Sequence, residues 1–188
     1  MSKVIDFQAN AMARLRAKVA ALDEANADLL AYARGHTGAV AQIHAAALAA
    51  MDADGLDHLV HIVTQDWVDI LGVDAVALAL VTRSQAIRAS APSLQLLSAE
   101  ALSEAFAGGP DITLRAVERG ADVFGPMADL IRSEALVRLP MPKPMPAGML
   151  ALGARAAHNF EGGHGGELLA FLGNVVSRMI TRWLLTPP

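Results

Sequence analysis

The feature that most constrains the fold is a stretch without proline or glycine, residues 5–34. Its apolar positions alternate at spacings of three and four, which is the heptad pattern of a helix with one apolar seam. At 1.5 Å per residue this helix would be about 45 Å long. A helix of that length with a single apolar stripe needs a partner to cover it. The seam consists of Ile5, Met12, Leu15, Val19, Leu22, Asn26, Leu29 and Ala33, with Gln8 in one gap.

Two partners could cover this seam. A second copy of the chain could supply the same helix, with Asn26 paired across the axis, or the helix could fold back on its own domain. We favour the homodimer, because a buried Asn at an a position fixes the register of parallel coiled coils. Otherwise Asn26 is a surface residue beside an imperfect seam.

The same register continues to about residue 47, past two glycines. Gly35 and Gly38 each cost about 1 kcal/mol in a helix interior. We therefore expect a bend or break over residues 34–38 and a second helical stretch over about 39–52.

The rest of the chain alternates short helices with strands. We expect one helix over 55–71, one that begins after the N-cap Ser98, a helical turn over 126–133 and a last helix over 166–185. The expected strands are 74–81, a hairpin partner at 86–90, 111–117, and an antiparallel pair at 134–141 and 147–155. The proline-rich residues 140–146 between that pair form an extended loop, with a ligand for a proline-recognising domain as the alternative.

This order is typical of an α+β fold, with a mainly antiparallel sheet flanked by helices and preceded by a long N-terminal helix. Residues 1–50 are expected to form a helical, coiled-coil-like segment, and residues 51–188 a mixed domain. The last helix is apolar on two sides. We therefore assign Met179 and Trp183 to the dimer interface, together with Leu15, Val19, Leu22, Asn26 and Leu29 of the seam.

Composition excludes several classes of function. The chain has no cysteine, so disulfides, thiolate nucleophiles, cysteine zinc sites and Fe–S clusters are excluded. A net charge of −4 gives no basic field for direct binding of nucleic acid. The longest apolar run has about seven residues, against roughly 20 for a membrane helix, and the start does not resemble a signal peptide. We expect a cytoplasmic protein without membrane contact.

The glycine- and histidine-rich turn before the last helix is the first candidate site. A phosphate loop would need a Lys and a Ser or Thr where the chain has Glu167. His158, Glu161 and His164 are spaced by three, but intervening glycines keep them off a helix, which disfavours a metal site. His58 and His61 are expected on the solvated face of helix 55–71. We predict no metal, no cofactor and no catalytic constellation.

Several stretches carry a resemblance to a known family. The residues "VIDFQANAMARLR", "VFGPMADLIRSEALVRLPM" and "GMLALGARAAHNFEGGHGGELLAFLGNVVSRMITRWL" resemble the bacterial domain of unknown function 484 family over nearly the whole chain. That resemblance implies a GAF-like sensory domain with an N-terminal helix, and no catalytic residues to carry over. It also points weakly to a tyrosine recombinase as a protein partner. Ala154 and Gly166 replace a usual Ser and Thr, which puts any anion site built on those hydroxyls in doubt.

The resemblance also suggests where a ligand could lie. In GAF-like domains small molecules usually sit between the sheet and irregular segments such as residues 92–133. The candidate ligand-binding residues there are Arg132, Ser133 and Arg115, ahead of Glu118 and Arg119. The structural alternative is that Ser133 ends a turn and Arg132 pairs with a surface acid.

Three functional hypotheses follow from these observations. The first is a non-enzymatic, homodimeric regulatory module that senses a small molecule or binds a protein. The second is an interaction scaffold with a closed core. The third is an uncharacterised enzyme that uses His158 or His164.

Overall fold

The structure is a computed structural model that describes residues 2–81, 94–160 and 165–185. In the first helix, the side chains outside the description are those of residues 2–11, 13, 15, 17, 25 and 27–36. The chain divides into two compact units, Met1–Ala41 and Gln42–Pro188.

The first helix has no break. Helix α1 (Ser2–Met51) includes residues 34–38, so the expected bend there is wrong. Two glycines cost roughly 2 kcal/mol together, but the alanine-rich residues that follow have high helix propensity. In the second unit, the last turns of α1 also bury one face in the core, through Ile43, Ala46, Ala47 and Ala50.

The predicted helix over 55–71 is confirmed, but it is not uniform. It consists of α2 (Leu56–His61), a π-helical turn η1 (Ile62–Asp66) and α3 (Trp67–Leu71). Gly72 ends it in the left-handed conformation, with φ of 64°. The indole N–H of the fully buried Trp67 donates to the carbonyl of Ala46 at 2.9 Å. This bond ties α3 to the end of α1.

The sheet has five strands in the order β2-β1-β5-β4-β3. Three antiparallel pairings, β1 with β5, β5 with β4 and β4 with β3, confirm a mainly antiparallel sheet. The short β2 pairs with the end of β1 in parallel and was not predicted, and the hairpin strand expected at 86–90 lies outside the described residues. The strands are β1 (Ala75–Leu80), β2 (Gln95–Leu96), β3 (Ile112–Ala116), β4 (Ser133–Leu139) and β5 (Gly148–Ala154).

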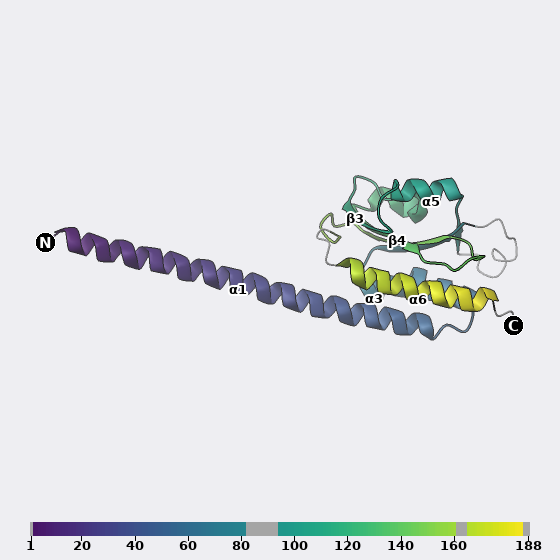
Figure 1. Ribbon diagram of the computed structural model, residues 1–188, viewed down its shortest axis with the longest axis horizontal. Helices are drawn as coiled ribbons and strands as arrows, with labels where there is room; N and C mark the ends of the chain where they lie inside the picture. The colour runs from purple at the N-terminus through teal and green to yellow at the C-terminus, as the bar shows by residue number, and fades with distance from the viewer. Residues whose placement is uncertain (1, 82–93, 161–164, 186–188) are drawn as a thin grey trace. The chain divides into compact units, whose positions relative to one another are not determined.

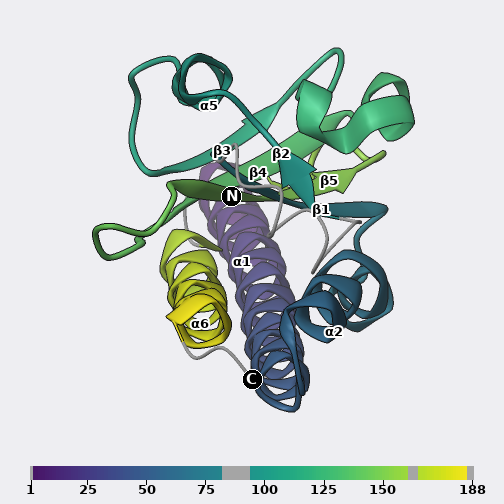
Figure 2. The same ribbon diagram turned by 90° about the vertical axis from the view of Figure 1, so that its right-hand side faces the viewer.

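Helices cover both faces of this sheet (Figures 1 and 2). One face packs against α6 (Gly166–Leu185) and α2 through strand residues such as Val137 and Leu150. The other face packs against α5 (Ala99–Phe106) and the 3-10 segment η2 (Asp122–Leu130) through strand residues such as Leu136 and Met149. The α+β prediction is confirmed in this two-sided arrangement.

Two helix predictions can be checked in detail. The hydroxyl of Ser98 accepts from the backbone N–H of Ala101 at 3.1 Å, which confirms Ser98 as the N-cap of α5. Helix α6 has the predicted bounds. In the described chain it is also the one helix long and apolar enough to cross a bilayer, yet Leu172, Val176 and Ile180 are fully buried in the fold, as in a core helix.

Candidate functional site

Arg115, predicted to bind a ligand, holds a buried carboxylate of its own chain. Strand pairing places it directly opposite Glu134. Its Nε and Nη2 atoms donate to Glu134 Oε1 at 2.8 and 2.6 Å, and the backbone N–H of Ala121 donates to Oε2 at 2.7 Å. The Glu134 side chain is 1% exposed and that of Arg115 is 40% exposed. The cluster therefore ties the start of η2 to the sheet.

The other two predicted ligand residues are also engaged within the chain. The Oγ of the fully buried Ser133 donates to the carbonyl of Ala156 at 2.7 Å. The exposed Arg132 donates from Nη1 to the carbonyls of Asp129 and Ile131 at 2.9 and 2.8 Å, not to an acid. Ligand binding at Arg115, Arg132 and Ser133 stays a prediction.

Apolar side chains pack closely between the sheet and η2. A Cβ added at Gly153 would lie 2.7 Å from Ile131 Cδ1 and 3.1 Å from Phe124 Cε1. Leu102 and Phe106 of α5 are also buried on this face. The described residues therefore fill the space over Gly153 on this side of the sheet with their own side chains.

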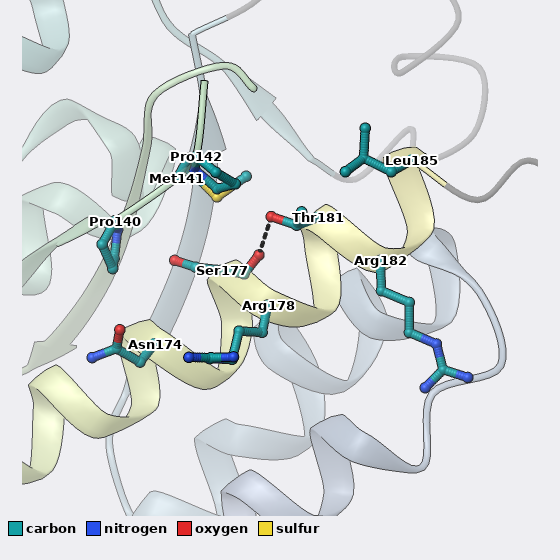
Figure 3. Close-up of a pocket in the computed structure, with 9 residues that line it drawn as sticks. All are labelled: Pro140, Met141, Pro142, Asn174, Ser177, Arg178, Thr181, Arg182 and Leu185. Carbon is teal, nitrogen blue, oxygen red and sulfur yellow. Dashed lines mark hydrogen bonds between the residues drawn. The ribbon is translucent and has the colours of Figure 1, made fainter. Parts of the chain in front are cut away.

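The hollow with the clearest chemistry lies along α6, where a groove of about 750 Å³ separates the helix from the segment that follows β4 (Figure 3). We call it the α6 groove. One wall consists of Pro140, Met141 and Pro142. The other wall consists of Asn174, Ser177, Arg178, Thr181, Arg182 and Leu185, whose spacings of three and four place them on one side of the helix.

The α6 groove is polar and cationic. Arg178 and Arg182 are both exposed, and the structure gives neither an ion pair with any described residue. Thr181 Oγ1 donates to the carbonyl of Ser177 at 2.7 Å, while the Ser177 Oγ is buried and has no hydrogen-bond partner. None of the lining residues is acidic.

Sequence reasoning missed this site. The prediction for α6 considered only its apolar positions. Two arginines four residues apart on a helix that is otherwise mostly apolar were the signal that could have found it.

A second hollow of about 450 Å³ lies at the edge of β1, and Val123, Phe124 and Met127 of η2 also line it. Its polar lining residues include Thr64 and Gln65 of the π-helical turn and Gln95 of β2. Gln95 Nε2 donates to the carbonyl of Val123 at 2.6 Å, so its amide is already engaged.

Two shifted pKa values belong to surface pairs outside both hollows. Hydrogen bonds to Asp122 and then to Asp129 raise the pKa of the Arg119 guanidinium above its usual range. The backbone N–H of Glu100 itself, followed by the hydroxyl of Ser98, lowers the pKa of the Glu100 carboxyl. Both shifts reflect local structure, since these bonds hold a loop and a helix start in place.

The structure describes three of the histidines that we considered as candidate site residues. His58 and His61 are exposed, which confirms their placement on the solvated face. His158 is exposed on the turn after β5, whereas Glu161 and His164 lie outside the described residues. Among the described side chains, no three His, Cys, Asp or Glu groups gather as metal ligands.

The seam residues that can be placed are exposed. Met12 and Val19 are each 52% exposed, Leu22 is 61% exposed and Asn26 is exposed as well, whereas the side chains of Leu15 and Leu29 lie outside the description. Later members of the same stripe, Ile43 and Ala47, are buried within the second unit.

The two residues of α6 that we assigned to the dimer interface, Met179 and Trp183, differ in exposure. Met179 is 7% exposed and packs in its own core, so its side chain offers little surface to a partner. Trp183 is half-buried, and the Arg182 guanidinium lies 5.1 Å from its ring.

Comparison with known proteins identifies the family of this chain. A family model described as "Protein of unknown function, DUF484" matches residues 1–185. The chain belongs to the DUF484 family. This DUF484 chain is also similar to the GAF domain from Acinetobacter phosphoenolpyruvate-protein phosphotransferase, with a TM-score of 0.51 and 15% identity. The likeness covers 78% of this chain and 95% of that domain.

At 15% identity the similarity shows the fold alone, which is GAF-like, as the sequence predicted. A comparison of the DUF484 chain with curated proteins finds no match.

Proposed function

We propose that this DUF484 protein is a non-enzymatic regulatory module that acts as a homodimer and responds to a small molecule or a protein partner. In this proposal residues 1–50 pair the two copies, residues 51–188 form the responsive domain, and the protein works in the cytoplasm. The GAF-like fold supports a regulatory role, since domains of this kind typically serve regulation. A tyrosine recombinase as the protein partner stays a prediction.

The observation that carries the homodimer is the exposed seam of α1. Val19 and Leu22 expose more than half of their surface on a helix of 50 residues. Covering apolar surface stabilises by about 25 cal/mol per Å². A second copy supplies a matching stripe, and Asn26 would then set the register of the pair. We leave Met179 out of the proposed interface, because it is already covered by its own core.

The test is the oligomeric state, measured by sedimentation velocity at micromolar concentration. We expect the wild type to be a dimer and the V19E/L22E variant to be a monomer, because two carboxylates would be placed in the seam. The matched control is A20E/A21E, which adds the same charge at exposed neighbouring positions outside the seam and should remain a dimer. A monomeric wild type, or equal behaviour of the two double variants, would contradict the homodimer.

A scaffold with a closed core is the second candidate. The close packing of Phe124 and Ile131 on Gly153 favours it, because those side chains occupy the space between the sheet and η2. Native mass spectrometry of freshly purified protein, compared with denaturing mass spectrometry of the same sample, separates the two functions. Extra mass that is lost on denaturation supports a sensor, whereas a dimer without added mass supports the scaffold.

A further inference from the structure

We propose that the α6 groove binds a small dianion, recognised through carboxylate or phosphate oxygens, and that this is the ligand of the regulatory module. The inference rests on the proposed function and names the chemical class of its ligand. It assigns binding to the helix α6 side of the sheet rather than to the side covered by η2.

The first argument is that the two arginines of the α6 groove have no acidic partner among the described residues. Elsewhere in the described second unit, four arginines are paired with acids, and Arg132 donates to backbone carbonyls. The four paired arginines are Arg115, Arg119, Arg138 and Arg155. Only Arg178 and Arg182 lack such partners among the described residues of that unit. They stand one helical turn apart on one face, where like charges repel each other. Figure 3 shows their guanidinium groups pointing apart, so the exposed Arg182 side chain would have to rotate for one dianion to neutralise both.

The second argument is the hydroxyl of Ser177. This residue is 3% exposed, it lines the groove, and its Oγ has no hydrogen-bond partner. Buried polar atoms in folded proteins nearly always have a partner, so this hydroxyl beside a hollow has a bond left to make, either with its own helix or with a bound ligand. A rotation about χ1 would let this hydroxyl donate to a ligand oxygen held by the arginines.

The third argument is the shape and lining of the groove. Its volume of about 750 Å³ lies within the range of small-molecule sites, roughly 300–1,000 Å³. Pro140 and Pro142 form one wall, whose φ angles are restricted by their rings. Guanidinium groups present a planar fork of donors that matches carboxylate and phosphate oxygens. Because the lining contains no acidic side chain, nothing in it would repel an anion.

The test uses the full chain and two simple probes, sodium succinate and sodium phosphate. Isothermal titration calorimetry at low ionic strength measures the Kd of each, and sodium chloride at matched ionic strength reports the non-specific effect of salt. The variant is R178Q/R182Q. The matched control is R14Q/R16Q, which removes the same charge from two exposed arginines of the first unit.

We expect the wild type and R14Q/R16Q to bind at least one probe with equal affinity, and R178Q/R182Q to bind it at least tenfold more weakly. Tighter binding of succinate identifies a carboxylate ligand, and tighter binding of phosphate identifies a phosphorylated one. The proposal is overturned if neither probe binds more tightly than chloride, or if R178Q/R182Q binds like the control. If the double variant does not fold, as judged by circular dichroism, the single variants R178Q and R182Q are measured in its place, and wild-type affinity in both overturns the site.

Failure of this inference can be told apart from failure of the proposed function. Sedimentation of the same samples reports the homodimer, whatever the probes do. A dimer that binds neither probe overturns the anion site alone, whereas a monomer that binds succinate or phosphate through Arg178 and Arg182 supports the site and contradicts the dimer.

Discussion

The carboxylate of Glu134 is held by three donors in a place that water does not reach. Sequence reasoning could identify Arg115 as a notable cation but not its partner. The two residues are 19 positions apart and meet because of the register between β3 and β4. That register depends on how the whole sheet packs, so the sequence alone could not show that Arg115 pairs with Glu134.

This pair gives a prediction at the residue scale. Removing one partner of a buried pair leaves an uncompensated charge or donor, which costs about 3–5 kcal/mol when both groups are buried. Since Arg115 is 40% exposed, we expect Arg115→Met to lower the free energy of unfolding by about 1–3 kcal/mol. Glu134→Leu should have a similar effect, and the double variant should lose less than the sum of the two.

Urea denaturation of the four proteins in this double-mutant cycle measures the coupling between Arg115 and Glu134. The control is Arg119→Met, whose acidic partners are exposed and which should lose clearly less stability. Strict additivity of Arg115→Met and Glu134→Leu would contradict the pairing.

Glu100 gives a prediction about pH. Its carboxyl has a lowered pKa in the folded state, so its charged form stabilises the protein. That contribution is complete above the ordinary pKa of a glutamate and is lost as pH falls through the lower folded-state value. Glu100→Gln should therefore lower the melting temperature at neutral pH, and the difference from wild type should vanish in acid. A Glu100→Gln effect that persisted in acid would argue against this cause.

At the scale of elements, the sequence predicted most of the helices and strands because their apolar periodicity is strong. Strand β1 lies where a continuous apolar run placed it, and β4, β5 and α6 lie where alternation, strand pairing or helical spacing placed them. The continuity of α1 was missed because glycine propensity is local, whereas the burial of Ala46 and Ala50 in the core comes from tertiary packing. The π-helical turn has no signature in a single sequence.

Packing of α6 on the sheet gives a prediction for this scale. A Cβ added at Gly173 would lie 2.8 Å from Cγ1 of Val137, a buried β-branched residue with little freedom to move. Gly173→Ala gains about 1 kcal/mol in helix propensity but costs about 1–3 kcal/mol in overpacking. We expect a net loss of stability in urea denaturation. Gly166→Ala, at the open first position of α6, should lose nothing; equal effects of the two would contradict a tight contact between α6 and β4.

The whole molecule combines a long helix with a GAF-like domain, and the proposed homodimer gives the last prediction. Isolated helices with exposed side chains are marginal in water and gain their stability from packing. Backbone amides of residues 12–24 should therefore exchange with deuterium slowly at high protein concentration and quickly after strong dilution. Amides of β4 and β5 should show no such dependence, because they belong to a core within one chain. Mass spectrometry of peptides measures both, and concentration-independent exchange over 12–24 would argue against pairing of α1.

Fluorescence of the two tryptophans can report on two different places in the fold. Trp67 is fully buried against the end of α1, whereas Trp183 is next in sequence to Arg182 of the α6 groove. Substituting either one with phenylalanine leaves a single tryptophan, which can be excited apart from the one tyrosine of the chain. The unfolding of the core and the occupancy of the groove can then be followed as separate optical signals. Because the chain has no cysteine, one introduced thiol can also carry a unique dye at any chosen position.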